Sequence, residues 1–202
     1  MNRRVDPIFW RASVALLAGT LTAALLLIAA LSLGWNSPRP SGMPDWEDSV
    51  VPRRLDAAAH TTELTLLNQT GKDFAFEIIA RPISGPESGS YGYGLAYRAQ
   101  DPSHYYAFAV GADGYYAVLR IDGSREILLA PWQQFPHIRR KGGNRLRVTC
   151  EGRSCTFAIN DEYTATVEDD TWLKGDVGLW IRAFDEPVSV QYQSVRIWSS
   201  HR

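Results

Sequence analysis

The feature that most constrains this fold is a period of two in the apolar side chains from about residue 55 onward. Short runs of alternating apolar and polar residues follow one another, separated by Gly, Pro, Asn, Asp or Ser. Such runs predict β-strands, because successive side chains of a strand point to opposite faces. No segment beyond residue 55 has the period and caps of a helix. The predicted strands cover residues 63–67, 73–80, 91–98, 104–110, 115–121, 125–130, 145–150, 155–160, 163–167, 177–184 and 188–198.

These runs predict an all-β domain. Eleven strands within about 145 residues are typical of a two-sheet antiparallel jelly-roll sandwich rather than a small barrel. Tight hairpins are expected at residues 111–114, 122–123 and 160–161, which contain Gly, Asp or Asn. The alternation also assigns side chains to the core faces of the strands. These predicted core residues are Phe74, Phe76, Ile78, Leu146, Val148, Cys150, Cys155, Phe157, Ile159, Val177, Leu179 and Ile181.

The two cysteines flank a predicted hairpin turn. If residues 145–150 and 155–160 pair around residues 151–154, Cys150 lies directly opposite Cys155. Cross-strand Cβ atoms at ~4.5–5.5 Å can close to a disulfide with modest adjustment. A structural disulfide is the favoured interpretation, and two buried free thiols are the alternative. A zinc site is disfavoured, because no His or further Cys lies near in sequence.

The N-terminal segment differs in kind from the rest of the chain. Residues 12–35 contain no charged residue. About 20 apolar residues cross a bilayer as a helix, so this run predicts a transmembrane helix that contacts membrane lipid. Arginines at positions 3, 4 and 11 precede it, and acidic residues follow it. The positive-inside rule then predicts a single-pass membrane protein with residues 1–11 in the cytoplasm and the C-terminal domain outside it.

A cleaved signal peptide is the alternative, with a cleavage site at Ala30-Leu31-Ser32. The uncharged run is longer than the ~7–15 apolar residues of such peptides, which favours the uncleaved anchor. Residues 36–54 carry four prolines and no sustained period, so they predict an extended linker. The predicted folded domain is then residues 55–202.

Four segments resemble concanavalin A-like lectin and glucanase domains, and more narrowly laminin G-like and 3-keto-disaccharide-hydrolase-type jelly rolls. They are Y-G-L-A-Y-R-A-Q-D-P-S-H-Y-Y-A-F at 93–108, N-R-L-R-V-T-C with F-A-I-N-D-E-Y within 144–163, G-D-V-G-L-W at 175–180, and the closing strand at 184–197. Asp161 replaces the usual Gly of the family's hairpin. The resemblance implies a curved two-sheet jelly roll that often binds glycans; its motifs mark architecture rather than activity.

The catalytic signal is weak. Glucanases of that superfamily carry paired carboxylates on one strand face, and glycoside hydrolysis requires two of them. The nearest strand here, residues 73–80, carries only Glu77 among apolar residues. No G-x-S-x-G, H-E-x-x-H or Gly-rich phosphate loop is present. We therefore expect no catalytic residue, and a glycoside hydrolase is the least favoured function.

No cofactor is expected. The concanavalin A-like resemblance implies that a structural calcium could be held by acidic loops, and Asp185 with Glu186 or Asp169 with Asp170 are the pairs to consider. Solvated turn acids are the preferred interpretation of both pairs. The formal net charge of −1 argues against a nucleic-acid partner.

Aromatic and arginine side chains give the better functional lead. Trp180 and Arg182 have the parity opposite to Leu179 and Ile181, and Tyr106, Tyr116, Arg98 and Arg120 are expected to share their face. Aromatic rings stack on sugar rings while polar groups bond the hydroxyls, so this set predicts a glycan-binding groove. Packing of the same rings within the sandwich is the competing interpretation.

The segment after Trp132, residues 133–141, is the most basic stretch. It is expected to be a solvated loop; contact with anionic lipid headgroups or a partner subunit is the alternative. The function predicted from the whole sequence is a membrane-anchored, non-catalytic module that binds carbohydrate. The alternative from another class is an accessory subunit of a larger membrane complex.

Overall fold

The computed structural model describes residues 7–32, 40 and 42–199. Side chains at residues 7–12 and 29–32 of the helix are not described. The chain divides into two compact units, residues 1–37 and residues 38–202.

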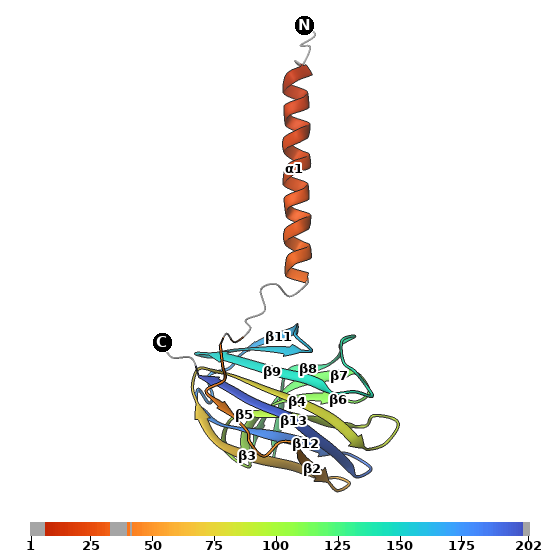
Figure 1. The fold of residues 1–202 in the computed structure, drawn as a ribbon, viewed down its shortest axis with the longest axis vertical. Coiled ribbons are helices and arrows are strands. Elements are labelled where there is room, and N and C mark those ends of the chain that lie inside the picture. Colours follow the sequence, from red (N-terminus) through yellow and green to blue (C-terminus); the bar gives the residue numbers. More distant parts are fainter. Residues whose placement is uncertain (1–6, 33–39, 41, 200–202) are drawn as a thin grey trace. The chain divides into compact units, whose positions relative to one another are not determined.

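The first unit contains the helix α1, Pro7–Ser32 (Figure 1). The helix begins before the first residue of the predicted span, residues 12–35, and ends before its last residue. Residues 33–35 lie outside the described residues. Side chains at residues 13–28 are exposed. Within the described residues, no helix has both the length and the apolar character that a membrane crossing requires.

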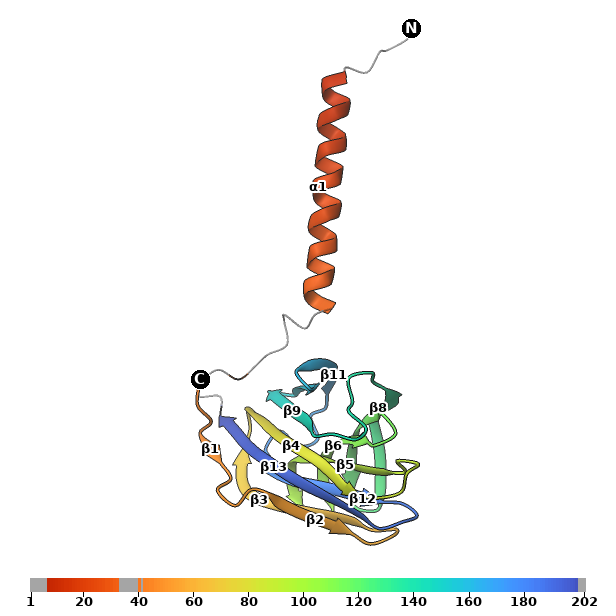
Figure 2. The same cartoon turned by 45° about the vertical axis from the view of Figure 1, so that its right-hand side comes forward.

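The second unit is an all-β sandwich of two antiparallel sheets, as predicted (Figures 1 and 2). One sheet has the order β1-β13-β4-β9-β10-β11, and β2 also pairs with β13. The other has the order β3-β12-β5-β6-β7-β8. The strands of the seven-stranded sheet are β1 (Trp46–Glu47), β2 (Arg53–Ala57), β4 (Phe74–Ser84), β9 (Asn144–Glu151), β10 (Ser154–Ile159), β11 (Glu162–Glu168) and β13 (Val188–Ser199). Those of the six-stranded sheet are β3 (Thr62–Gly71), β5 (Tyr91–Asp101), β6 (His104–Gly111), β7 (Tyr115–Asp122), β8 (Arg125–Gln134) and β12 (Gly175–Ala183).

All eleven predicted strands are present, and β1 and β2 are additional. Strand β1 lies within the segment expected to be a linker and β2 begins at its end, but both pair with β13 of the sandwich. The predicted start of the folded domain at residue 55 is therefore wrong. Proline cannot donate to a strand ladder but is tolerated beside short edge strands. The proline content of residues 36–54 therefore concealed two edge strands.

The core lies between the two sheets, and all twelve predicted core side chains belong to it. The tight hairpin predicted at Asn160 and Asp161 is also present, and both residues have the left-handed conformation, with φ of 54° and 70°. It joins β10 to β11. Cys150 faces Cys155 in the ladder of β9 and β10, and the two form the predicted disulfide.

Candidate functional site

The outward face of the six-stranded sheet carries a second apolar cluster, separate from the core between the sheets. Small residues form its floor, because Gly94, Ala96, Ala107 and Ala109 occupy adjoining positions of β5 and β6. The ring of Trp180 lies against this floor. A Cβ added at Gly92 would meet the Trp180 ring at 3.0 Å. The glycines and alanines of this face therefore leave room for one large aromatic side chain.

Trp180 is fully buried, although it faces outward from the sandwich. Its indole Nε1 donates to the Tyr105 hydroxyl at 3.2 Å, and the Arg182 guanidinium lies 5.2 Å from the ring centroid. The predicted parity of Trp180 and Arg182 is confirmed, but the Trp180 ring is packed rather than open. Substitution of Trp180 by Ala would therefore test packing, not contact with a ligand.

Arg182 connects the two end strands of its sheet across the outward face. Its Nε donates to Thr62 Oγ1 of β3 at 3.0 Å, and its Nη1 pairs with Glu126 Oε2 of β8 at 2.6 Å. Strands β12 and β8 are four places apart in the sheet, which is ~19 Å on a flat sheet. An Arg–Glu pair cannot span that distance, so the sheet curves strongly and this face is concave. The ion pair closes the concave face above Trp180.

Arg182 also lines an open cleft at the end of this face. The cleft has a volume of about 340 Å³. The turn before β3 and the loop after β12 form its walls, and the His60 amide donates to the Phe184 carbonyl at 2.8 Å to hold them together. We call it the rim cleft. Its lining residues are His60, Thr61, Thr62, Arg182, Ala183, Phe184 and Asp185.

The rim cleft combines one exposed aromatic ring with several hydrogen-bonding groups. The Phe184 side chain is 39% exposed, so its ring offers an apolar surface to a ligand. His60, Thr62 and Asp185 supply donors and acceptors beside it. Its volume lies within the range of small-ligand sites, ~300–1,000 Å³. Asp185 is the only carboxylate among the lining residues, whereas glycoside hydrolysis uses two.

Tyr106 and Tyr116 do not share the face of Trp180, so that expectation is wrong. Both rings belong to the core between the sheets, because residues of even number in β6 and β7 point inward. The Tyr116 hydroxyl donates to the Thr164 carbonyl at 3.0 Å. The Tyr106 hydroxyl donates to Asp169 Oδ1 at 2.6 Å. Burial, followed by the hydrogen bond with Asp169, raises the pKa of Tyr106 to about 12.

Arg120 and Arg98 also lie away from Trp180. Arg120 has the inward parity of Tyr106 and pairs with Asp169 Oδ2 at 2.6 Å. Arg98 is 1% exposed, and its Nη2 donates to the carbonyls of Gly152 at 2.6 Å and Lys72 at 3.2 Å. Burial lowers the pKa of Arg98. Both side chains hold neighbouring loops in place.

The acidic residues considered as calcium ligands are either hydrogen-bonded to other side chains or exposed. Asp169 accepts hydrogen bonds from Tyr106 and Arg120, while Asp170, Asp185 and Glu186 are exposed. In the part of the chain that the structure describes, no three His, Cys, Asp or Glu side chains are grouped as metal ligands.

The sequence prediction missed Phe184, His60 and Thr62. Alternation alone could have found Phe184, because residues 180, 182 and 184 share one parity. No sequence signal placed His60 and Thr62 there, since they lie more than a hundred residues earlier and reach Arg182 only through the pairing of β3 with β12.

Comparison with known proteins supports the architecture. No protein-family model matches this sequence, and no curated protein matches it. Among solved structures, the carbohydrate-binding module CBM66 from Bacillus subtilis is similar, with a TM-score of 0.62 and 19% identity over 80% of this chain and 100% of that one. A Bacillus subtilis protein of unknown function with a galectin-like fold gives 0.54 and 14%, over 79% and 97%. The Bacillus licheniformis β-glucanase gives 0.51 and 9%, over 80% and 91%.

These likenesses define the class of fold and nothing finer. The second unit, residues 38–202, has the two-sheet antiparallel jelly-roll sandwich fold of these solved structures.

Proposed function

We propose that this protein is a non-catalytic module that binds carbohydrate in the rim cleft. The observation that carries the proposal is the exposed Phe184 ring beside Arg182, Thr62 and Asp185 in one cleft. Sugar rings present apolar C–H faces that stack on aromatic rings, and their hydroxyls bond to charged and hydroxyl side chains. The carbohydrate-binding module among the solved structures of this fold supports the same ligand class.

In this proposal, Phe184 is the stacking ring and Arg182 the central hydrogen-bond donor. Trp180 supports Arg182 from below through the contact of its ring with the guanidinium. Thr62 and Glu126 fix the direction of the guanidinium from two sides, so little conformational entropy is lost on binding. Thus two of the predicted residues belong to the proposed site, Trp180 as support and Arg182 as ligand contact.

A glycan array followed by calorimetry of the positive saccharide tests this function. We expect Phe184→Ala to weaken binding by about tenfold, equivalent to ~1.4 kcal/mol, because the stacking surface is lost while the fold is kept. Tyr163→Ala is the matched control, since Tyr163 is 48% exposed on the other sheet and should leave affinity unchanged. Arg182→Lys should also weaken binding, because lysine cannot reproduce the directions of the guanidinium donors.

If no saccharide binds, or if Phe184→Ala and Tyr163→Ala behave alike, the rim cleft is not a carbohydrate site. Recovery of a stoichiometric membrane partner from detergent, with no glycan bound, would instead favour the accessory-subunit function.

We further propose that residues 12–35 anchor the domain in a membrane, with the domain on the extracytoplasmic side. The support is the sequence itself: 24 successive uncharged positions, preceded by three arginines and followed by acidic residues. Membrane fractionation of the full chain tests this proposal.

A further inference from the structure

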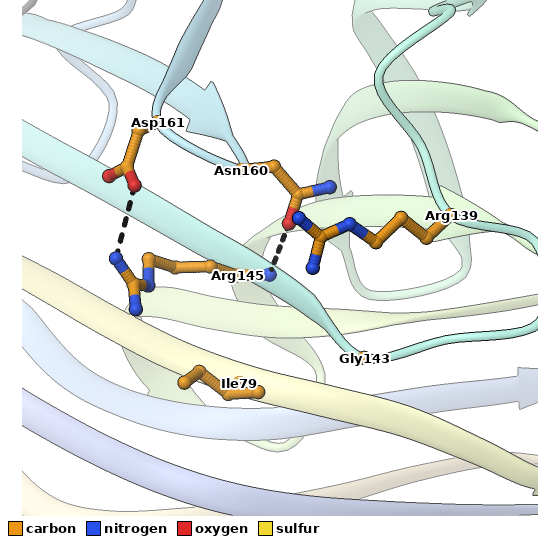
Figure 3. A pocket seen from close by; sticks show the side chains of 6 residues that line it. All are labelled: Ile79, Arg139, Gly143, Arg145, Asn160 and Asp161. Atoms are coloured by element: carbon orange, nitrogen blue, oxygen red, sulfur yellow. Dashed lines mark hydrogen bonds and ion pairs between the residues drawn. The ribbon is translucent and has the colours of Figure 1, made fainter.

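A second cleft opens on the seven-stranded sheet, away from the rim cleft. It has a volume of about 160 Å³, which is room for several water molecules. Strand β4, the loop between β8 and β9, strand β9 and the β10–β11 turn contribute to it. Figure 3 shows its lining residues, which are Ile79, Arg139, Gly143, Arg145, Asn160 and Asp161.

The acidic groups around this cleft are already paired. Asp161 Oδ2 lies 3.0 Å from Arg145 Nη1, and Asp161 Oδ1 lies 2.9 Å from Arg147 Nη2. Beneath them, the buried Glu77 lies 3.7 Å from Arg145 Nε and 3.4 Å from Arg147 Nη1. Two carboxylates thus neutralise two arginines, and Arg139 adds a further positive charge to the same cleft. Among the described residues, no carboxylate lies within ion-pair distance of the Arg139 guanidinium.

The backbone of Arg139 is held rigidly although its side chain is exposed. The fully buried Asn144 accepts from the Arg139 amide at 2.8 Å and donates to the Arg139 carbonyl at 2.9 Å. Asn160 in turn donates to Asn144 Oδ1 at 2.8 Å and to the His137 carbonyl at 2.7 Å. Ile138, between these two loop residues, is buried in the core. A long cationic side chain therefore projects from a fixed base.

The opposite wall is fixed at Asp161. This residue has φ of 70°, a left-handed conformation that is uncommon for residues other than glycine. Its carboxylate directs the Arg145 guanidinium along the edge of the cleft, and Figure 3 shows Arg139 reaching toward Asn160 from the other side. The two-residue hairpin turn between β10 and β11 needs this conformation, which Asn and Asp tolerate. The turn therefore fixes the backbone from which the Asp161 carboxylate reaches Arg145.

We propose that this cleft binds an oxyanion, namely the carboxylate, sulfate or phosphate group of a small ligand, through Arg139 and Arg145. Arginine suits such groups because its planar guanidinium offers paired N–H donors. Arg139 supplies the uncompensated charge, and Arg145 shares its donors between Asp161 and the ligand. The cleft is large enough for one such group with a few waters. This site is independent of the rim cleft, which lies on the other sheet.

Calorimetric titration of the full chain with inorganic phosphate and with glucuronate, at constant ionic strength, tests the proposal. Glucose serves as the uncharged comparison for glucuronate. We expect at least one of the two anions to bind saturably and glucose not to bind at this site. Phosphate binding shows that the free ion is sufficient, whereas binding of glucuronate alone shows that the sugar acid is the ligand. Arg139→Gln should weaken binding by about tenfold or more, since a charge-assisted pair is lost.

Two further variants separate this site from general charge attraction. Lys141→Gln removes an exposed positive charge from the same loop but not from the cleft, and it should leave affinity unchanged. Asp161→Asn tolerates the left-handed turn and releases Arg145 from a competing charge, so it should bind the anion several-fold more tightly. Circular dichroism confirms that each variant is folded. Absence of saturable binding, equal losses in Arg139→Gln and Lys141→Gln, or no gain in Asp161→Asn would overturn the proposal.

Discussion

At the scale of single residues, the carboxylate of Asp169 joins two strands of the sandwich to the loop after β11. Its carboxylate accepts hydrogen bonds from the Tyr106 hydroxyl and the Arg120 guanidinium, each at 2.6 Å, and from the Thr171 amide at 2.8 Å. Burial by itself would raise the pKa of Asp169. The hydrogen bonds from Tyr106 and Thr171, together with the charge of Arg120, outweigh burial and lower the pKa below 3.8. The folded state therefore favours the ionised form.

Because the folded-state pKa is lowered, Asp169 stabilises the fold above its ordinary pKa and loses this contribution as the pH falls through the lowered value. We expect Asp169→Asn to reduce the free energy of unfolding at neutral pH by about 1–3 kcal/mol. The deficit should shrink as the pH falls below 3.8. Urea unfolding at several pH values measures it. The exposed neighbour gives the control: Asp170→Asn should match the wild type throughout, and a deficit of Asp169→Asn that is independent of pH would contradict the assignment.

At the scale of elements, the hairpin of β9 and β10 shows how local sequence becomes tertiary structure. The register pairs Phe157 with Val148 and Ile159 with Leu146, so all four apolar side chains enter the core together. The same register brings Cys150 opposite Cys155. The disulfide therefore closes a hairpin whose register is already set by its turn and by the burial of its apolar side chains.

Replacing both cysteines with alanine should lower the free energy of unfolding by about 2 kcal/mol, because closing a loop this short restricts the unfolded chain only modestly. Packing losses at the two buried sites add to this value. Urea unfolding of the double variant measures the total, and reduction of the wild type by a thiol reagent separates the contribution of the bond from that of the side chains. A reduced wild type as stable as the oxidised one would show that the bond contributes nothing.

At the scale of the whole molecule, the helix unit and the sandwich are separate compact units. All strand pairings in the described part of the chain join residues from Trp46 onward. The sandwich also has its own core between two sheets. These observations indicate that residues 38–202 fold without the N-terminal unit.

We expect a chain of residues 38–202 to unfold with the same thermal midpoint as the full chain. If the proposed anchor is correct, the full chain should sediment with membranes and resist alkaline extraction, while residues 38–202 stay in the aqueous fraction. Circular dichroism and membrane fractionation measure the two properties separately. A full chain that is released by alkali would refute the anchor without affecting the fold.

The predicted parity of Trp180 shows where prediction of the site reached its limit. Alternation placed Trp180 and Arg182 on one face correctly, because β12 continues without a bulge from Gly178 to Ala183. It failed for Tyr106 and Tyr116, whose faces depend on the register of other strands. Whether an aromatic ring on the outward face is exposed or covered depends on how strongly the sheet curves. The Arg182–Glu126 pair that reveals this curvature joins residues 56 positions apart.

The sequence by itself determined the all-β class, the eleven main strands, the core faces and the disulfide, since each follows from local alternation and turn chemistry. The tertiary structure decided the edge strands β1 and β2, the burial of Trp180 and the composition of both clefts. These features arise where distant strands meet, and alternation along one strand carries no information about which other strand lies beside it or how far a sheet curves.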